Sequence, residues 1–321
     1  MSSNGKARRG KVLLAVLVVA ALAVASLWYL KLPALAWYGL RTAFATEDWR
    51  ERGLWLPDYR VTIEAQPIAG LEQNASGITY NDATDTLFIA INNPSQIAEL
   101  SRDGCLLRMI PVVGVDDLEG VTHVQGDEFA LIDERSQQII WTKITPETRS
   151  IDAAGAHRVG VGIFLNGNLG FEGVSWNNAT QSLFVGKEKY PVRVFSLQGL
   201  APESDQPVNL QIHEWQPKVP PTRFMRDLSS LSLHDRSGHM LLLSDESALV
   251  AEYSQEGALV SLMPLWRGWH GLAQSIPQAE GVTVDHRGIL YIVSEPNLFY
   301  RFERDGEAGE ARKASACTAQ R

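Results

Sequence analysis

The chain has 321 residues, a formal net charge of −8 and two cysteines, Cys105 and Cys317. An acidic chain without a basic, aromatic-lined stripe argues against nucleic acid as a partner. The cysteines lie far apart and form neither a CxxC pair nor a Cys/His cluster, so no zinc site is expected. In an exported chain they can form a disulfide, and two unpaired thiols fit the sequence equally well.

The first predicted element is a membrane-spanning helix. Residues 12–30 form an unbroken apolar run, close to the about 20 residues that cross a bilayer. The preceding basic residues, which include Arg8, Arg9 and Lys11, favour a cytoplasmic tail at residues 1–11. A cleaved signal peptide is the alternative, although its apolar region usually has only about 7 to 15 residues. We therefore expect a single-pass protein of the inner (cytoplasmic) membrane, with the remainder on the periplasmic or extracellular side.

The rest of the chain divides into three parts. Residues 31–58 have mixed composition without strand alternation, and we interpret them as a juxtamembrane stalk. Residues 59–308 are long enough for one domain with a large core. Residues 309–321 form a C-terminal tail.

The main domain is built from an internal repeat of strand, Asn/Asp/Gly turn, strand, polar turn and strand. A period of about 40 to 50 residues with roughly four strands per unit is typical of propeller blades. The sequence therefore predicts an all-β, five-bladed β-propeller, and a sixth, degenerate blade is possible within 144–170 or 198–226. The five units carry a small residue in one shared slot: Gly77, Gly120, Gly173, Ser230 and Gly281.

The two ends of the repeat array predict how the ring closes. "YRVTIEAQPI", Tyr59 to Ile68, precedes the first repeat and has the pattern of an outer fourth strand. The last repeat stops after its third strand at "LFYRFERDG". Pairing of the two would remove two open sheet edges, so we expect the N-terminal strand to complete the last blade.

A glutamate precedes the small residue in three of the five repeats. Glu119, Glu172 and Glu280 occupy this position, and Ser76 and Ser229 occupy it in the other two. Because the motif opens the innermost strand of a blade, these side chains should converge at one mouth of the central channel. The next strand runs back to the same mouth, where a second layer is expected: Asn93, Glu134, Glu188, Glu246 and Glu295.

Such a cluster of acids predicts a cation. Two carboxylates about 4 Å apart repel by about 4 kcal/mol at an effective dielectric near 20. With oxygen donors alone, Ca²⁺ is favoured over zinc or copper. The seven glutamates are therefore candidate ligands or near neighbours of one Ca²⁺ ion. In the alternative interpretation, each glutamate caps a turn of its own blade.

The repeated "EGV[ST]" motifs, the "LF[IV]" second strands and the acidic turns "IDER" and "SDES" resemble the SdiA-regulated family of YjiK-like bacterial proteins. The resemblance covers the anchor and residues 59–306. It implies a five-bladed propeller with a calcium site, distantly similar to NHL-repeat proteins and to calcium-dependent propeller lactonases and phosphotriesterases. Ser76 and Ser229 depart from the acidic pattern.

Two function classes remain open on the sequence. No GxSxG elbow or Ser-His-Asp spacing is present, and only His123 and His270 are candidate bases near a channel mouth. We favour a membrane-anchored calcium-binding module that binds an unknown protein or small molecule at the channel mouth. The alternative is a calcium-dependent hydrolase of the lactonase, esterase or phosphotriesterase type.

Overall fold

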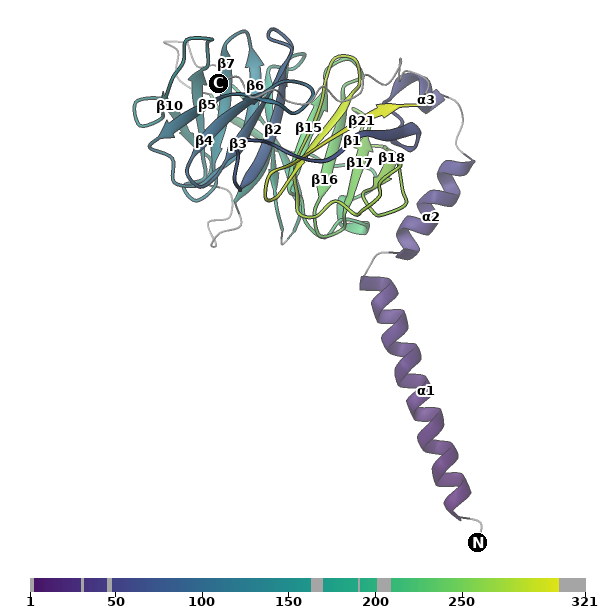
Figure 1. Cartoon of the computed structure of the whole chain (residues 1–321). Helices are drawn as coiled ribbons and strands as arrows, with labels where there is room; N and C mark the ends of the chain where they lie inside the picture. The colour runs from purple at the N-terminus through teal and green to yellow at the C-terminus, as the bar shows by residue number, and fades with distance from the viewer. Residues whose placement is uncertain are drawn as a thin grey trace.

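The computed structural model describes residues 3–29, 32–44, 48–162, 170–189, 191–200 and 209–305, and its strands form five sheets arranged as propeller blades (Figure 1). The helices α1 (Ser3–Tyr29), α2 (Leu32–Ala43) and α3 (Asp48–Arg52) and the 3₁₀ turn η1 (Leu56–Asp58) precede the first strand. The expected five-bladed propeller is confirmed.

Each blade is a four-stranded antiparallel sheet, and the first has one added strand. Blade 1 contains β2 (Ala75–Asn81), β3 (Thr86–Ile91), β4 (Gln96–Leu100), β5 (Leu106–Val113) and the parallel β9 (Ile151–Asp152). Blade 2 contains β6 (Leu118–Gln125), β7 (Glu128–Asp133), β8 (Gln138–Lys143) and β10 (His157–Gly160). Blade 3 contains β11 (Phe171–Asn177), β12 (Ser182–Lys187), β13 (Arg193–Gln198) and β14 (Gln211–Glu214). The turn η2 (Pro221–Arg223) leads to blade 4, β15 (Ser230–His234), β16 (His239–Ser244), β17 (Leu249–Tyr253) and β18 (Leu259–Pro264).

Blade 5 joins the two ends of the repeat array. It contains β19 (Ala279–Val284), β20 (Leu290–Ser294), β21 (Leu298–Arg304) and, at its outer edge, β1 (Tyr59–Pro67). β1 pairs antiparallel with β21, from Tyr59 opposite Arg304 to Pro67 opposite Leu298. This confirms the predicted closure. The segments considered for a sixth blade instead supply β9, β10 and β14, and their described residues form no further sheet.

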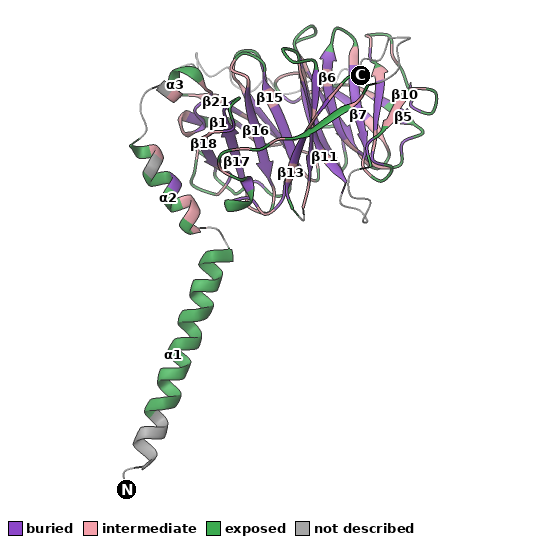
Figure 2. Cartoon of the chain, turned by 180° about the vertical axis from the view of Figure 1, so that it is seen from behind, coloured by how far each residue is buried: buried purple, intermediate pink, exposed green. Residues whose placement is uncertain are grey.

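The core lies between the blades. Each sheet packs both faces against neighbours, so the middle strands are apolar without alternation: all six residues of β16 are buried (Figure 2). The buried apolar side chains form five clusters, and each spans an interface between adjacent blades. Between blades 1 and 2, for example, the rings of Phe88 and Phe129 lie 4.7 Å apart.

The small-residue slot exists because the inner strands approach each other closely. A Cβ atom at Gly281 would lie 2.6 Å from the carbonyl oxygen of Ser76, and one at Gly173 would lie 2.7 Å from the nitrogen of Leu231. Both distances are shorter than real Cβ contacts, so a larger side chain would push the blades apart. In blade 4 the slot holds Ser230, whose Oγ accepts a hydrogen bond from the Val282 amide at 3.2 Å.

The chain before β1 is attached to blade 4 by a buried carboxylate. Glu252 has no exposed surface and accepts hydrogen bonds from the backbone amides of Leu54 (2.7 Å) and Trp55 (3.0 Å). His239 Nδ1 lies 2.7 Å from the same carboxylate, and the Ser261 hydroxyl donates to it at 2.6 Å. The segment that we interpreted only as a stalk therefore contains helices and a fixed attachment point.

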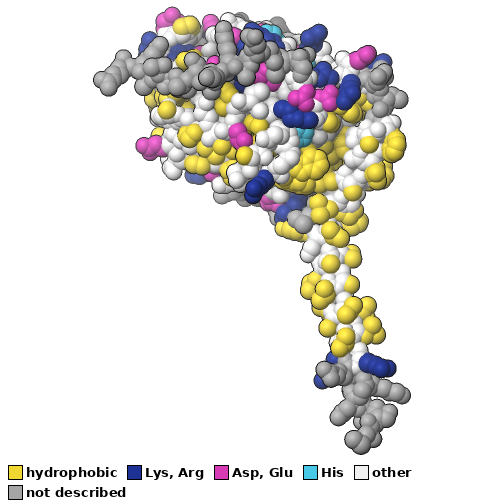
Figure 3. Space-filling view, turned by 45° about the vertical axis from the view of Figure 1, so that its right-hand side comes forward, with side chains coloured by type: hydrophobic (Ala, Val, Ile, Leu, Met, Phe, Trp, Pro, Cys, Tyr) yellow, Lys and Arg dark blue, Asp and Glu magenta, His cyan; other side chains and the backbone are white. Residues whose placement is uncertain are grey.

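The N-terminal helix is the candidate membrane span. Its stretch Arg9–Tyr29 is long and apolar enough to cross a bilayer, and none of it is buried in the protein (Figure 3). At its end the guanidinium of Arg226 lies 4.0 Å from the ring centre of Tyr29. α2 contacts blade 4, where the Tyr38 hydroxyl donates to the Val260 carbonyl.

Cys105 is disulfide-bonded. Cys317 and the tail at 309–321 lie outside the described residues.

Candidate functional site

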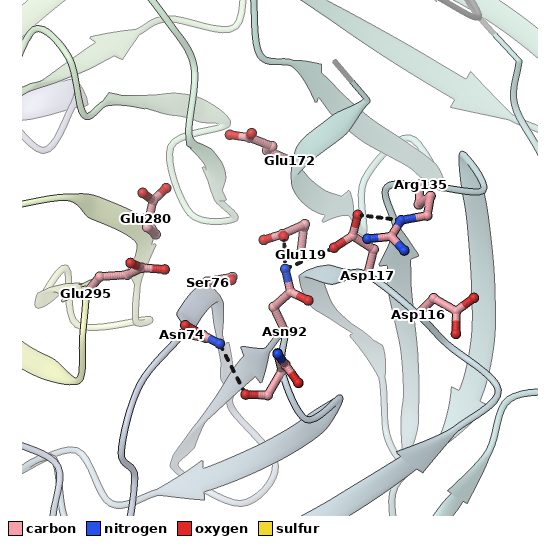
Figure 4. Close-up of a pocket in the computed structure, with 11 residues that line it drawn as sticks. Asn74, Ser76, Asn92, Asp116, Asp117, Glu119, Arg135, Glu172, Glu280 and Glu295 are labelled. Carbon is pink, nitrogen blue, oxygen red and sulfur yellow. Dashed lines mark hydrogen bonds and ion pairs between the residues drawn. The ribbon is translucent and has the colours of Figure 1, made fainter. Parts of the chain in front are cut away.

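One mouth of the central channel is acidic. The innermost strands β2, β6, β11, β15 and β19 contact one another around the channel, and the mouth lies where they begin. It contains a cavity of about 610 Å³, which we call the acidic mouth (Figure 4). The cavity is lined by Asn74, Ser76, Asn92, Asn93, Asp116, Asp117, Glu119, Arg135, Glu172, Glu280 and Glu295.

A β-bulge directs each of the three motif glutamates into this cavity. The pairing between the first two strands of the blade shifts register between Leu118 and Gly120, and it shifts in the same way around Glu172 and Glu280. Each glutamate is therefore the extra residue of its bulge, and an extra residue can turn its side chain away from the pleat. In each Glu-Gly pair the glutamate is the bulged residue, and the glycine allows the inner strand of the next blade to approach closely.

The acidic mouth raises the pKa values of its carboxyl groups. Burial raises the pKa of Glu280 to about 8, with a further contribution from the charge of Asp245. Burial, together with the charges of Glu188 and Glu134, holds the pKa of Glu172 well above its ordinary value. Burial also raises the pKa of Glu119, and hydrogen bonds partly oppose this effect. The ionised forms of these glutamates are therefore destabilised in the protein alone.

Nitrogen donors compensate only one side of the cavity. The Asn92 side-chain amide donates to Asp117 Oδ1 at 3.0 Å and also to Glu119 Oε1. The guanidinium of Arg135 lies 3.5 Å from Asp117 Oδ2. Within the described part of the chain, Glu172 and Glu280 form no ion pair. In Figure 4 the carboxylates of Glu119, Glu172, Glu280 and Glu295 surround one open space, and Asp116 lies apart.

The glutamates of the expected second layer fall into two groups, one that lines the cavity and one that forms ion pairs beside it. Glu295 lines the cavity with the motif glutamates. Glu188 and Glu246 instead pair with Lys189, at 3.0 Å for Glu246, and Glu246 also lies 3.1 Å from Arg226. These partners make them part of an ion-pair cluster beside the cavity.

Glu134 lies between these two groups. Its Oε1 accepts a hydrogen bond from the Gly170 amide at 2.8 Å, just before β11, so it caps the start of blade 3 rather than a turn of its own blade. Burial nevertheless raises its pKa to about 7, and the charge of Glu119 adds to the shift. Glu134 therefore interacts electrostatically with the carboxylates of the acidic mouth, although it does not line the cavity.

Sequence reasoning missed Asn74, Asn92 and Asp117 as parts of the mouth. Asn74 and Asp117 stand two residues before the glutamate position, as does Asp227 in blade 4. The Asp227 carboxylate accepts a hydrogen bond from the backbone amide of Glu246 at 3.2 Å. The repeated Asn or Asp two residues before the glutamate position could have indicated Asn74 and Asp117 from the sequence. No comparable sequence pattern indicates Asn92.

Neither candidate histidine lines the acidic mouth. His123 lines a cavity at the opposite mouth, where its Nε2 lies 2.9 Å from the Gly126 carbonyl oxygen. His270 lies 2.9 Å from the Tyr59 carbonyl oxygen and lines a groove beside α2. Its loop does not cover the acidic mouth.

The lining residues offer oxygen donors suited to a hard cation. As placed, no three His, Cys, Asp or Glu side chains among the described residues are close enough to hold a metal ion directly. An ion here would therefore need water molecules, or the oxygens of Asn92 and Ser76, to complete its coordination.

The chain matches one family model and aligns with several solved structures. The model of the family described as SdiA-regulated matches residues 51–303. A streptogramin B lyase structure aligns with a TM-score of 0.46 and 8% identity, over 77% of this chain and 98% of the other. A luciferin-regenerating enzyme aligns with a TM-score of 0.46 and 12% identity, over 75% and 80% of the two chains. For virginiamycin B lyase from Staphylococcus aureus the TM-score is 0.39 and the identity 12%, over 74% and 68%. At these identities the activities of those enzymes are not transferred to this chain.

Proposed function

The chain belongs to the SdiA-regulated family, and on that premise we propose that it is a membrane-anchored binding module whose acidic mouth holds a Ca²⁺ ion. In this proposal α1 crosses the inner (cytoplasmic) membrane once and the propeller lies on the periplasmic or extracellular side. The ligand is a protein or small molecule that binds at the channel mouth.

The observation that carries the proposal is the convergence of Glu119, Glu172 and Glu280 from three different blades. Their raised pKa values mean that ionising them together is costly in the protein alone. A divalent cation removes this cost because it stabilises the ionised carboxylates. Turn capping alone gives no reason to bury three acids of three blades around one cavity.

The donor set favours calcium over magnesium. Ca²⁺ accepts six to eight oxygen ligands in flexible geometry, whereas Mg²⁺ requires a near-regular octahedron and keeps several of its own water molecules. We assign ligation, direct or through water, to Glu119, Glu172 and Glu280. The surrounding acidic layer comprises Glu134, Glu188, Glu246 and Glu295.

We prefer binding to hydrolysis because of where the histidines lie. A hydrolase would need a base beside the ion to activate water. Neither His123 nor His270 lines the acidic mouth. Without a histidine base beside the cavity, we describe the protein by its proposed cation and its proposed membrane anchor.

Calorimetric titration tests the proposal. Full-length protein in detergent is stripped with chelator and titrated with CaCl₂, and we expect heat of binding and a raised melting temperature. Glu172→Gln should weaken calcium binding by at least about tenfold, which is about 1.4 kcal/mol. Glu256→Gln is the matched control, because Glu256 is exposed on the turn after β17. Absence of both calcium heat and thermal shift in the wild-type protein would contradict the proposal.

A further inference from the structure

The opposite mouth of the channel contains a second cavity, of about 410 Å³. We call it the second mouth, and it lies where the inner strands end. Its volume falls within the range of about 300 to 1,000 Å³ that is usual for small-molecule sites. The five inner strands contribute to its wall the residues Tyr80, His123, Trp176, Leu233 and Val284.

Hydroxyl groups beside this wall hold the blades together. The Thr79 hydroxyl accepts a hydrogen bond from the backbone amide of His123 at 3.1 Å, and the Thr122 hydroxyl accepts one from the amide of Trp176 at 3.1 Å. The Ser175 hydroxyl accepts a hydrogen bond from the amide of Leu233 at 3.0 Å. The second mouth is therefore bounded by three successive contacts between blades, and it is a rigid, preformed site.

One buried polar group of the second mouth lacks a partner. His234 is 7% exposed, and its Nδ1 lies 2.7 Å from the Ser237 hydroxyl. Its Nε2 atom is buried and has no hydrogen-bond partner among the described residues. Burial lowers the pKa of His234 to about 4, so the imidazole is neutral near pH 7 and offers one uncharged polar atom. A buried polar atom without a partner is costly, and a ligand that supplies the partner removes that cost.

Two of the three acids at the second mouth have a strong partner. Asp285 is fully buried and pairs with Arg102 at 2.7 Å. Asp235 accepts a hydrogen bond from Asn178 at 3.1 Å. Asp82 has a side chain that is 71% exposed, and Arg236 also lines the cavity. Because Asp285 and Asp235 have partners and Arg236 shares the lining with Asp82, we favour a neutral ligand over a cation or an anion.

The remaining groups favour a neutral ligand with many hydroxyls. Tyr80, which is partly exposed, provides aromatic carbon surface against which the C–H face of a sugar ring can pack, and the edge of the largely buried Trp176 lies beside it in the lining. The Asp82 carboxylate accepts hydrogen bonds from hydroxyls, and the hydroxyl oxygen or proton can satisfy His234 Nε2. From this geometry we propose that the second mouth binds a neutral saccharide, of mono- or disaccharide size.

Titration with defined sugars tests this proposal. Full-length protein is prepared in a polyoxyethylene detergent, which carries no sugar, with chelator present so that the result is independent of the acidic mouth. The probes are glucose, galactose, mannose, N-acetylglucosamine, maltose and cellobiose at millimolar concentration, with spermidine as a cationic competitor. We expect heat of binding with at least one sugar and none with spermidine.

Two variants and one control locate the site. Asp82→Ala changes an exposed residue and should leave folding intact, and His234→Phe keeps the ring but removes its nitrogens. Each should weaken sugar binding by at least about tenfold. Asp127→Ala, an exposed carboxylate on the neighbouring β6–β7 turn, should leave the affinity unchanged. The proposal is overturned if no sugar binds, if spermidine binds instead, or if Asp82→Ala binds the sugar as tightly as the wild-type protein.

Discussion

The side-chain amide of Asn92, after β3 of blade 1, donates a hydrogen bond to the carboxylate of Glu119 in blade 2. The same amide donates to Asp117 Oδ1 at 3.0 Å. One neutral side chain of blade 1 thus bridges two acids of blade 2.

Replacing Asn92 with alanine should destabilise the protein. Both acids lose a donor, and a hydrogen bond to a charged group contributes about 1.5 to 3 kcal/mol. We expect a loss of that order in urea unfolding at neutral pH with chelator present. Asn92→Asp should be less stable still, because it adds a third carboxylate, and calcium should recover more of its stability. Equal stability of the two variants in chelator would contradict this account.

Without calcium, stability should fall as the pH rises. The pKa of Glu280 is about 8 and that of Glu134 about 7 in the folded protein, against 4.5 for an ordinary glutamate. Between these values the folded state binds more protons than the unfolded state, so the unfolding free energy decreases with pH across this window. Saturating calcium should flatten or reverse the slope, because the ionised carboxylates are its ligands.

Melting temperatures at several pH values from about 5 to about 8, in chelator and in calcium, check this prediction. Glu280→Gln should reduce the slope measured in chelator. If calcium raises the melting temperature equally at both ends of the range, the acids are not the groups that respond to it.

Deleting β1 should open the ring. β1 pairs with β21 along the outer edge of blade 5, and its loss exposes that edge and the adjoining core. A chain that begins at Gly70 should melt at a lower temperature than one that begins at Tyr59, and it should aggregate more readily. Identical melting curves for the two chains would show that closure contributes nothing.

Glu252 should be among the costliest single substitutions in blade 4. Glu252→Ala leaves the amides of Leu54 and Trp55, the Ser261 hydroxyl and His239 without their shared acceptor. Buried donors without partners cost about 1 to 3 kcal/mol each, so we expect a loss of several kcal/mol in urea unfolding. Exposed Glu256→Gln is the control and should change stability by less than about 0.5 kcal/mol.

Topology is tested by reporter fusions. A C-terminal reporter that is active only outside the cytoplasm should be active, because the basic residues before Val12 retain the N-terminus inside. Activity of a cytoplasm-only reporter at the same position would reverse the proposed orientation.

The blades and their closure could be predicted because each depends on local patterns that repeat. Turn residues and the small-residue slot recur in every unit, and the unpaired strand at Tyr59 matches the missing strand after Arg304. The convergence of Glu119, Glu172 and Glu280 followed from the same periodicity.

The partners of the second acidic layer could not be predicted in this way. Glu188 and Glu246 align with Glu295 in the repeats, yet Lys189 and Arg226 pair with them in blades 3 and 4. These cations lie in connections that differ between repeats. The helix α2 was missed for a related reason, since its contact with blade 4 through Tyr38 depends on tertiary packing rather than on a repeated pattern.

The contact between Tyr29 and Arg226 fixes how the two ends of the channel are oriented relative to α1. Arg226 also pairs with Glu246 in the ion-pair cluster beside the acidic mouth, so the last turn of α1 ends at that rim. In a bilayer crossed by α1, the acidic mouth would then lie on the side of the propeller that faces the lipid headgroups. The second mouth opens toward the bulk solution on the far side. The proposed cation and the proposed sugar would therefore reach the propeller from opposite sides.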